Sequence, residues 1–158
     1  MNNDLLKTKM EYFDFSNPPT DPIELAKLLS QNMLDKNGIG LAANQLSLPY
    51  NVFVVKSNPI ICAFNPRIVH TSEEEVVMEE GCLSFPNLRV EVKRPVTIKL
   101  RFTMPNGETV TNEYTGLTSR VIQHEIDHLN GILFYERATK FHRDRAFRKM
   151  KNANRRKA

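Results

Sequence analysis

Two histidines and a glutamate stand together in the segment 123–128, whose sequence is QHEIDH. The surrounding residues predict a helix, on which His124 and His128 would lie on one face, one turn apart. Two neutral imidazoles at that spacing suit a divalent metal, and Glu125 beside them could take a proton from water on that metal. This is the H-E-x-x-H pattern, although an amphipathic helix with two ordinary histidines can show the same letters by chance.

A catalytic metal of this kind usually has three protein ligands, so the sequence should supply a third. One class of proteases uses a third histidine where this chain has Phe134, and another uses a glutamate on a following helix, for which Glu136 comes too early. Cys82 is the strongest remaining candidate, because a thiolate binds Zn²⁺ or Fe²⁺ tightly. A lone cysteine is more often a small core residue, and we interpret Cys62 in that way.

The first part of the chain predicts a loose lead-in followed by a helix. Residues 1–19 are polar and interrupted by Pro18-Pro19, so we expect them to be extended or loosely packed. Residues 21–24 (DPIE) suit a helix start, and Asn37-Gly38 suits its end. The residues predicted to face the core from this helix are Leu25, Leu28, Leu29 and Met33.

Short apolar or alternating runs then predict strands in residues 51–56, 60–64, 76–78, 90–92, 96–102 and 109–114. Gly116 with Thr118 or Ser119 should introduce the central helix, which Gly131 should end. On that helix Leu117 and Val121 share a face with the two histidines. A short apolar run and a basic helix close the chain. We therefore predict one α+β domain over residues 1–158, with antiparallel β-sheets packed around a central metal-binding helix, plus an N-terminal helix and a basic C-terminal helix.

Composition and charge describe an ordinary globular protein with a basic end. Of the 158 residues, 41% are hydrophobic and 25% charged, and we see neither a membrane-spanning run nor a signal-peptide layout. We therefore expect a cytoplasmic protein with reduced cysteines. The tail, residues 140–158, has nine basic residues and one acid, a net charge of +8 that leaves −4 for the rest. This predicts either a polyanionic partner or a solvated helix that aids solubility.

Three blocks of the chain together resemble the signature motifs of peptide deformylases, which remove the N-formyl group from the initiator methionine of nascent chains. The blocks are residues 38–45 (GIGLAANQ), 80–84 (EGCLS) and 123–129 (QHEIDHL), within a resemblance that runs from about residue 21 to 137. The resemblance implies that the metal ligands are Cys82, His124 and His128. It implies that Glu125 is the catalytic carboxylate, and that the Gln45 side chain and the Leu83 backbone N–H hold the substrate oxygen. The family's usual metal is one Fe²⁺ ion, with Zn²⁺ or Ni²⁺ as replacements.

The expected substrates are N-formylmethionyl peptides, which need a pocket for an unbranched apolar side chain. Ile39, Leu117 and Val121 are candidate walls, and the substrate backbone could pair with the strand that contains Gly38 and Gly40. By the same resemblance Arg89 would contact substrate, whereas Arg94 would be structural and pair with Glu80. The basic tail is then expected to dock on ribosomal RNA or protein.

The N-terminus departs from the pattern of typical bacterial members, because residues 12–19 stand where those members have a Pro-Asp-x-x-Leu-like stretch. The short form resembles deformylases carried by bacteriophages, so the expected location is the cytoplasm of a bacterium or of a phage-infected cell. Two other hypotheses stay open. One is a metallopeptidase that cuts internal peptide bonds. The other is a non-catalytic protein with a structural metal, closed by Cys62 as a fourth ligand, and an RNA-binding tail.

Overall fold

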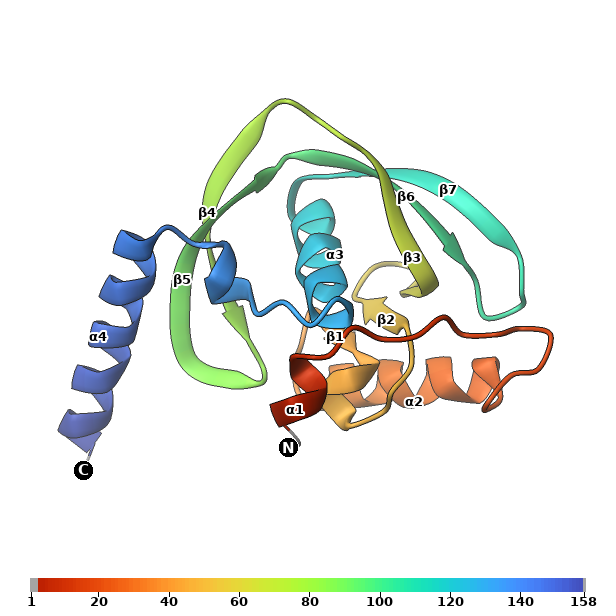
Figure 1. Ribbon diagram of the computed structural model, residues 1–158, viewed down its shortest axis with the longest axis horizontal. Coiled ribbons are helices and arrows are strands. Elements are labelled where there is room, and N and C mark those ends of the chain that lie inside the picture. Colours follow the sequence, from red (N-terminus) through yellow and green to blue (C-terminus); the bar gives the residue numbers. More distant parts are fainter. Residues whose placement is uncertain (1–2, 158) are drawn as a thin grey trace.

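Helix α3 (Gly116–Leu129) lies in the middle of the fold, with a β-sheet on either side (Figure 1). The structure, a computed structural model, describes residues 3–157. One sheet has the strand order β1 (Gly40–Ala42), β2 (Val52–Val55), β3 (Ile61–Thr71), β6 (Thr97–Thr103) and β7 (Thr109–Thr115). The other pairs β4 (Glu75–Cys82) with β5 (Phe85–Pro95). All neighbouring strands are antiparallel, which confirms the predicted α+β fold around a central helix.

The remaining helices surround this arrangement. They are α1 (Asn3–Leu6), α2 (Pro22–Asp35), the 3₁₀ turns η1 (Ala43–Leu46) and η2 (Phe134–Arg137), and α4 (Lys140–Lys157). Helix α2 begins as the sequence predicts, because the Asp21 carboxylate accepts hydrogen bonds from the backbone N–H groups of Ile23 and Glu24.

Helix α2 packs on the five-stranded sheet through a narrow apolar stripe. Leu25, Leu29 and Met33, each four residues apart, are buried against β1 and β2. The prediction that Leu28 also faces this core is wrong, since its side chain is 48% exposed. Successive helical residues are rotated by about 100°, so a stripe centred on the other three turns Leu28 to the edge of the contact.

The N-terminal segment is extended over residues 9–14, as predicted, but it is not loosely packed. The Met10 N–H donates to the carbonyl of Leu129 at 2.7 Å, and both backbone groups of Phe13 hydrogen-bond to the side-chain amide of Asn65. Met10 and Phe13 are both buried, and the Phe13 ring meets that of Phe64 edge to face. The polar composition of the segment hides these spaced apolar anchors, so of the two alternatives expected for it, loose packing is excluded for residues 9–14.

Helix α3 begins at Gly116, earlier than a cap at Thr118 or Ser119 would place it. The helix ends before Gly131, which has a φ of +72° and confirms the predicted stop. A Cβ atom at Gly131 would lie 2.7 Å from the backbone of Lys7, so the close approach of the N-terminal segment also requires glycine there.

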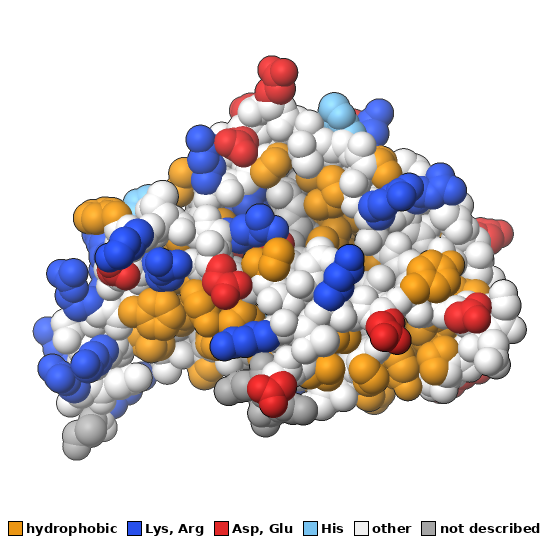
Figure 2. Space-filling view, in the orientation of Figure 1, with side chains coloured by type: hydrophobic (Ala, Val, Ile, Leu, Met, Phe, Trp, Pro, Cys, Tyr) orange, Lys and Arg blue, Asp and Glu red, His pale blue; other side chains and the backbone are white. Residues whose placement is uncertain are grey.

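Helix α4 confirms the predicted basic helix and stands at one end of the molecule (Figure 1). Among its described side chains Ala146 is buried, in a small core that includes Leu88, Val90 and Phe134. Figure 2 shows Lys and Arg side chains gathered over this helix. No helix within residues 3–157 has both the length and the apolar character needed to cross a membrane.

Candidate active site

Three side chains from two elements meet beside α3 and offer a set of metal ligands. His124 and His128 lie one helical turn apart with ring centres separated by 5.0 Å, and Cys82 approaches them from the end of β4. The Cys82 Sγ lies 3.2 Å from the His128 Nε2, and one ligand atom of each residue lies within 4.8 Å of the others. One sulfur and two imidazole nitrogens suit Zn²⁺ or Fe²⁺.

Buried charges orient the His124 ring. The Glu80 carboxylate lies 3.0 Å from the His124 Nδ1, which leaves Nε2 for the ligand cluster. Arg94 holds Glu80 with two hydrogen bonds of 2.7 and 3.0 Å, which confirms the predicted pair, and Arg120 also bonds to the same carboxylate. Arg94 reaches on to Asp127 at 2.8 Å. Such partners behind a ligating histidine fix its tautomer and direction.

The protonation of these groups follows from the same contacts. Burial alone would raise the pKa of Glu80, but hydrogen bonds from His124 and Arg94 more than offset it and lower the pKa to about 2. Burial would likewise lower the pKa of His124, but contacts with Cys82 and Glu80 raise it to about 10. Because a metal binds the neutral imidazole, metal binding at His124 would compete with this proton.

His128 has the properties of a neutral ligand. Burial, together with the nearby charges of His124 and Arg94, lowers its pKa to about 3. Its Nδ1 is buried and has no hydrogen-bond partner within residues 3–157. Asn44 fixes the backbone here, since its Nδ2 donates to the His128 carbonyl at 2.6 Å. An uncharged imidazole whose Nε2 faces a thiol, beside a second imidazole, fits a divalent metal.

Glu125 lies beside this cluster with one oxygen unpaired. Its side chain is buried, and within the described part of the chain its Oε2 has no hydrogen-bond partner. Burial raises the pKa of Glu125 to about 7. Strand β1 passes so close that a Cβ atom at Gly40 would lie 2.5 Å from the Glu125 Oε1. A carboxyl with a pKa near neutrality can both accept and return a proton.

Gln45 presents its amide nitrogen to the same cluster. The Gln45 Oε1 accepts the Ala42 N–H at 2.9 Å, so the side-chain orientation is fixed. Its Nε2 then donates to Ser84 Oγ at 3.1 Å and approaches Cys82 Sγ at 3.6 Å. Leu83 lies in the turn between them, directly after Cys82.

A pocket of about 430 Å³ opens above these groups and is bounded by the residues that the sequence analysis assigned to substrate binding. Its lining includes Gly38, Ile39, Gly40, Gln45, Cys82, Leu83, Arg89, Leu117, Val121, His124 and Glu125. Ile39 and Leu117 are more than half exposed at its mouth, and Val121 is buried. The Arg89 guanidinium lies against Gly81, where an added Cβ would approach it to 2.9 Å. His128 lies beneath, almost fully buried.

Cys62 is not part of this cluster. It lies on β3, paired with Val54 of β2, and packs beside the apolar core under α2. Burial raises the pKa of its thiol to about 12. The group of possible metal ligands found within residues 3–157 contains Cys82 and not Cys62, so no fourth protein ligand comes from that cysteine.

Several residues that shape the site were not predicted from the sequence. Asp127 binds both Arg94 and Arg137, and Asn44 holds α3 in place. Both stand inside the motif blocks, so their position in those blocks was an available clue. Phe134 was excluded as a ligand, and its ring packs 5.4 Å from that of His124. Glu136, also excluded, accepts the Leu133 N–H within η2.

Comparison with known proteins places this geometry in a known context. The family model described as polypeptide deformylase matches residues 1–144. A peptide deformylase from Synechocystis sp. is 43% identical over 120 residues, which are 72% of this chain and 64% of that protein. One from Bradyrhizobium diazoefficiens is 38% identical over 148 residues, covering 87% and 84% of the two chains. A Met-Ala-Ser-bound peptide deformylase from Acinetobacter baumannii has a similar structure, with a TM-score of 0.79 and 34% identity over 87% of this chain and 94% of that one.

Proposed function

The chain belongs to the polypeptide deformylase family, and we propose that the pocket above Cys82, His124 and His128 hydrolyses the N-formyl group of formylmethionyl nascent chains. The observation that carries this proposal is the meeting of one thiol, two imidazoles, a buried carboxyl and a fixed amide at the floor of one pocket. We assign the whole chain, residues 1–158, to a single catalytic domain with a basic tail at 140–158.

The three ligand residues would hold one divalent ion, Fe²⁺ as the native metal, with Zn²⁺ or Ni²⁺ able to replace it. When bound, such an ion supplies a Lewis acid that polarises the formyl oxygen and lowers the pKa of water. Glu80 keeps the His124 Nε2 turned toward that position, and Asn44 keeps the end of α3 in place for His128. The thiolate of Cys82 completes the set from the second sheet.

Glu125 is the proton carrier of the proposed reaction. Its buried carboxylate accepts the proton of the attacking water at the unpaired Oε2, and the hydroxide adds to the formyl carbon. As the C–N bond breaks, the same oxygen returns the proton to the amine of methionine. Formate and a free N-terminus are the products. A pKa of about 7 suits both steps, because the carboxyl can change its protonation state near neutral pH.

Two groups of this chain would stabilise the charge on the formyl oxygen in the transition state. One is the Gln45 side-chain amide, whose nitrogen already faces the cluster because its oxygen is bound by Ala42. The other is the backbone N–H of Leu83, in the turn after Cys82. Fixed donors of this type need no reorganisation during the reaction, and removing one typically costs about 3 kcal/mol in the barrier.

The pocket walls suit a methionine side chain at the chain terminus. Ile39, Leu117 and Val121 supply apolar surface, and Arg89 stands where it could contact the peptide. The peptide backbone would pair with the segment from Gly38 to Leu41, adding a strand to the sheet. The lack of a side chain at Gly40 lets β1 itself pass close to Glu125 at the edge where the peptide would pair. Binding of Met-Ala-Ser by the similar Acinetobacter baumannii protein supports this choice of substrate.

The partner that presents these substrates would be the ribosome, with the enzyme working in the cytoplasm of a bacterium or of a phage-infected cell. The exposed basic side chains of α4 would dock on ribosomal RNA or protein. This contact should weaken as salt concentration rises, because it relies on neutralising phosphate charge.

The decisive experiment is formate release from formyl-Met-Ala-Ser, with protein purified without oxygen and its metal content counted. We expect release that chelation abolishes, and at least a hundredfold loss in Glu125→Ala with metal retained. Met-Ala-Ser without the formyl group should not be cleaved. Cleavage of that peptide would instead favour an internal peptidase, and a metal-loaded but inactive protein would favour a structural site.

A further inference from the structure

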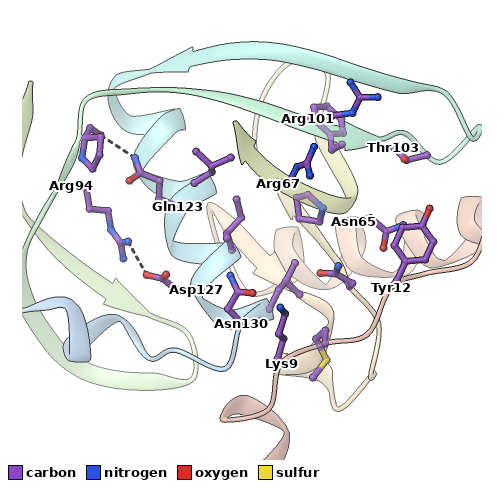
Figure 3. A pocket seen from close by; sticks show the side chains of 18 of the residues that line it. Lys9, Tyr12, Asn65, Arg67, Arg94, Arg101, Thr103, Gln123, Asp127 and Asn130 are labelled. Carbon is purple, nitrogen blue, oxygen red and sulfur yellow. Dashed lines mark hydrogen bonds and ion pairs between the residues drawn. The ribbon is translucent and has the colours of Figure 1, made fainter. Parts of the chain in front are cut away.

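A second and larger hollow lies on a different face of α3 from the candidate active site. It is a groove of about 930 Å³ whose wall uses positions 123, 126, 127 and 129 of the helix and Asn130 just after it, whereas the candidate active site uses positions 117, 120, 121, 124 and 125. Figure 3 shows the groove, with the N-terminal segment passing the end of α3 near Asn130 and with β3 and β6 beside it. Any molecule bound there would leave the mouth of the candidate active site open.

The groove carries an excess of positive charge. Its lining contains six cationic side chains and two carboxylates, namely Lys9, Arg67, Lys93, Arg94, Arg101 and Arg137 with Glu75 and Asp127. Both carboxylates are already paired, Glu75 with Lys93 and Asp127 with Arg94 and Arg137. Across residues 3–157, no ion pair involves Lys9, Arg67 or Arg101. The surplus charge is thus concentrated on Lys9, Arg67 and Arg101.

Two of these cations are placed against each other. Arg67 of β3 and Arg101 of β6 are directly opposite partners in the antiparallel register, so their side chains leave the same face of the sheet. Figure 3 shows them on neighbouring strands at one side of the groove. Like charges in directly opposite positions destabilise a sheet. A bound anion that accepts hydrogen bonds from both guanidinium groups would remove this repulsion.

The facing wall offers an aromatic ring on a rigid support. Tyr12 is 74% exposed, yet its neighbours Met10 and Phe13 are buried and hydrogen-bonded to the body of the protein. Lys9 stands on the same segment, and the exposed Asn130 lies at the end of α3. Cations that follow a phosphate backbone, together with a ring on which a base can stack, are the combination that binds single-stranded nucleic acid.

We propose that this groove binds a stretch of single-stranded RNA, with Lys9, Arg67 and Arg101 on the phosphates and Tyr12 stacked on a base. The choice of RNA rests on the proposed function, because an enzyme that acts on nascent chains works beside RNA. The groove is a separate surface from the basic tail, since no residue of α4 lines it. It would hold the enzyme on RNA while the candidate active site remains free for peptide.

The test is the fluorescence anisotropy of a labelled single-stranded RNA of about 12 nucleotides, titrated with full-length protein between about 50 and 200 mM KCl. Arg67→Gln/Arg101→Gln should weaken binding about tenfold at the lowest salt. It should also reduce the slope of log K against log salt by about 1.4, which corresponds to two lost phosphate contacts. Tyr12→Ala should weaken binding about fivefold or more without changing that slope, and Tyr12→Phe should bind normally.

Matched variants separate the groove from general charge and from the tail. Lys36→Gln/Lys56→Gln removes the same charge from exposed positions outside both hollows, and should bind RNA within about twofold of the native protein. Replacement of Arg148, Lys149, Lys151, Arg155 and Arg156 by Gln should leave the effects of the groove variants in place. The groove assignment is wrong if Arg67→Gln/Arg101→Gln binds like the native protein, or if the Lys36/Lys56 variant loses as much. An acidic peptide that displaces the RNA at equal charge would also overturn the choice of RNA.

Formate release from formyl-Met-Ala-Ser keeps this result apart from the proposed function. Arg67 and Arg101 lie outside the candidate active site, so their double variant should keep the native rate. If the native protein releases formate but does not bind the RNA, only the proposal that the groove binds RNA is refuted. RNA binding without any formate release would refute the proposed reaction and leave the groove assignment standing.

Discussion

Two parts of the interior of this protein, the apolar half under α2 and the charged half beside α3, have opposite character. Between α2 and the five-stranded sheet the buried side chains are apolar, and the core there includes Phe13, Leu25, Leu29, Met33, Val52, Val54 and Phe64. Between α3 and the β4–β5 hairpin the buried residues include Glu80, Arg94, Arg120, Gln123, His124 and Asp127. Burying an apolar side chain stabilises a fold by about 1.5–3 kcal/mol, whereas a buried ion pair often contributes little net stability. We infer that the apolar half stabilises the fold, whereas the charged half fixes the positions of the side chains at the candidate active site.

The two cysteines illustrate this division. Cys62 borders the apolar half, where burial raises the pKa of its thiol to about 12. Cys82 borders the charged half, within reach of His128 and Gln45. The same side chain is therefore kept protonated in one half and offered to a metal in the other.

The largest effect on stability should come from the apolar half. Phe64 is fully buried and its ring contacts those of Phe13 and Phe15. Phe64→Ala should lower the free energy of unfolding by about 3–5 kcal/mol, because it leaves a cavity, while each folded molecule keeps its metal. Urea denaturation and metal counting measure the two quantities. Phe141→Ala, at a 69% exposed position, should change stability by less than about 0.5 kcal/mol. Loss of metal from folded Phe64→Ala protein would contradict the division.

The next effect should appear in the reaction and not in stability. Gln45→Ala removes the fixed amide beside Cys82 and should raise the barrier by about 3 kcal/mol, a fall in kcat of about a hundredfold or more. Metal should stay bound, because Gln45 is not a ligand. Steady-state formate release measures kcat, with Gln31→Ala on the surface of α2 as the control. Turnover near the native rate would remove Gln45 from the mechanism.

Glu80→Gln tests whether the charged half sets geometry. The amide leaves Arg94 and Arg120 without their carboxylate and weakens the hold on the His124 Nδ1. Metal affinity, measured by competition with a chelator, should fall about 10- to 100-fold. Glu75→Gln breaks an exposed pair with Lys93 and should leave affinity unchanged. If both variants bound metal equally well, Glu80 would have no orienting role.

The smallest effect concerns Cys62 and pH. In the unfolded chain this thiol loses its proton near pH 9.0, whereas in the folded protein it keeps it up to about pH 12. The contribution to stability is therefore complete below pH 9 and decreases as pH rises above it, by about 1.4 kcal/mol at pH 10. Cys62→Ala should flatten this decrease in urea unfolding measured at pH 8 and pH 10. An identical pH dependence in the variant would show that the thiol ionises at its ordinary pKa.

The elements of the site were predictable because they rest on local spacing. The i, i+4 histidines needed only a helix, and the chemistry of the metal favoured Cys82 over Phe134 and Glu136. The pair of Arg94 with Glu80 was predicted as well. The error at Leu28 and the alternative left open for the N-terminal segment arose where tertiary contacts decide, since helical period does not say how wide a stripe the sheet will cover. The RNA groove could not be foreseen, because Lys9, Arg67 and Arg101 come from distant parts of the chain.

Because β1 passes so close to α3, substitutions at Gly40 are restricted. At position 40 the first carbon of any side chain would meet the Glu125 carboxylate at 2.5 Å and the Val121 side chain at 2.7 Å. Every missense change of that codon therefore pushes against Glu125, the carboxyl that we propose as the proton carrier. Even a single methyl group there would force the Glu125 carboxylate, the Val121 side chain or β1 to move, and no rise in peptide concentration could restore their positions.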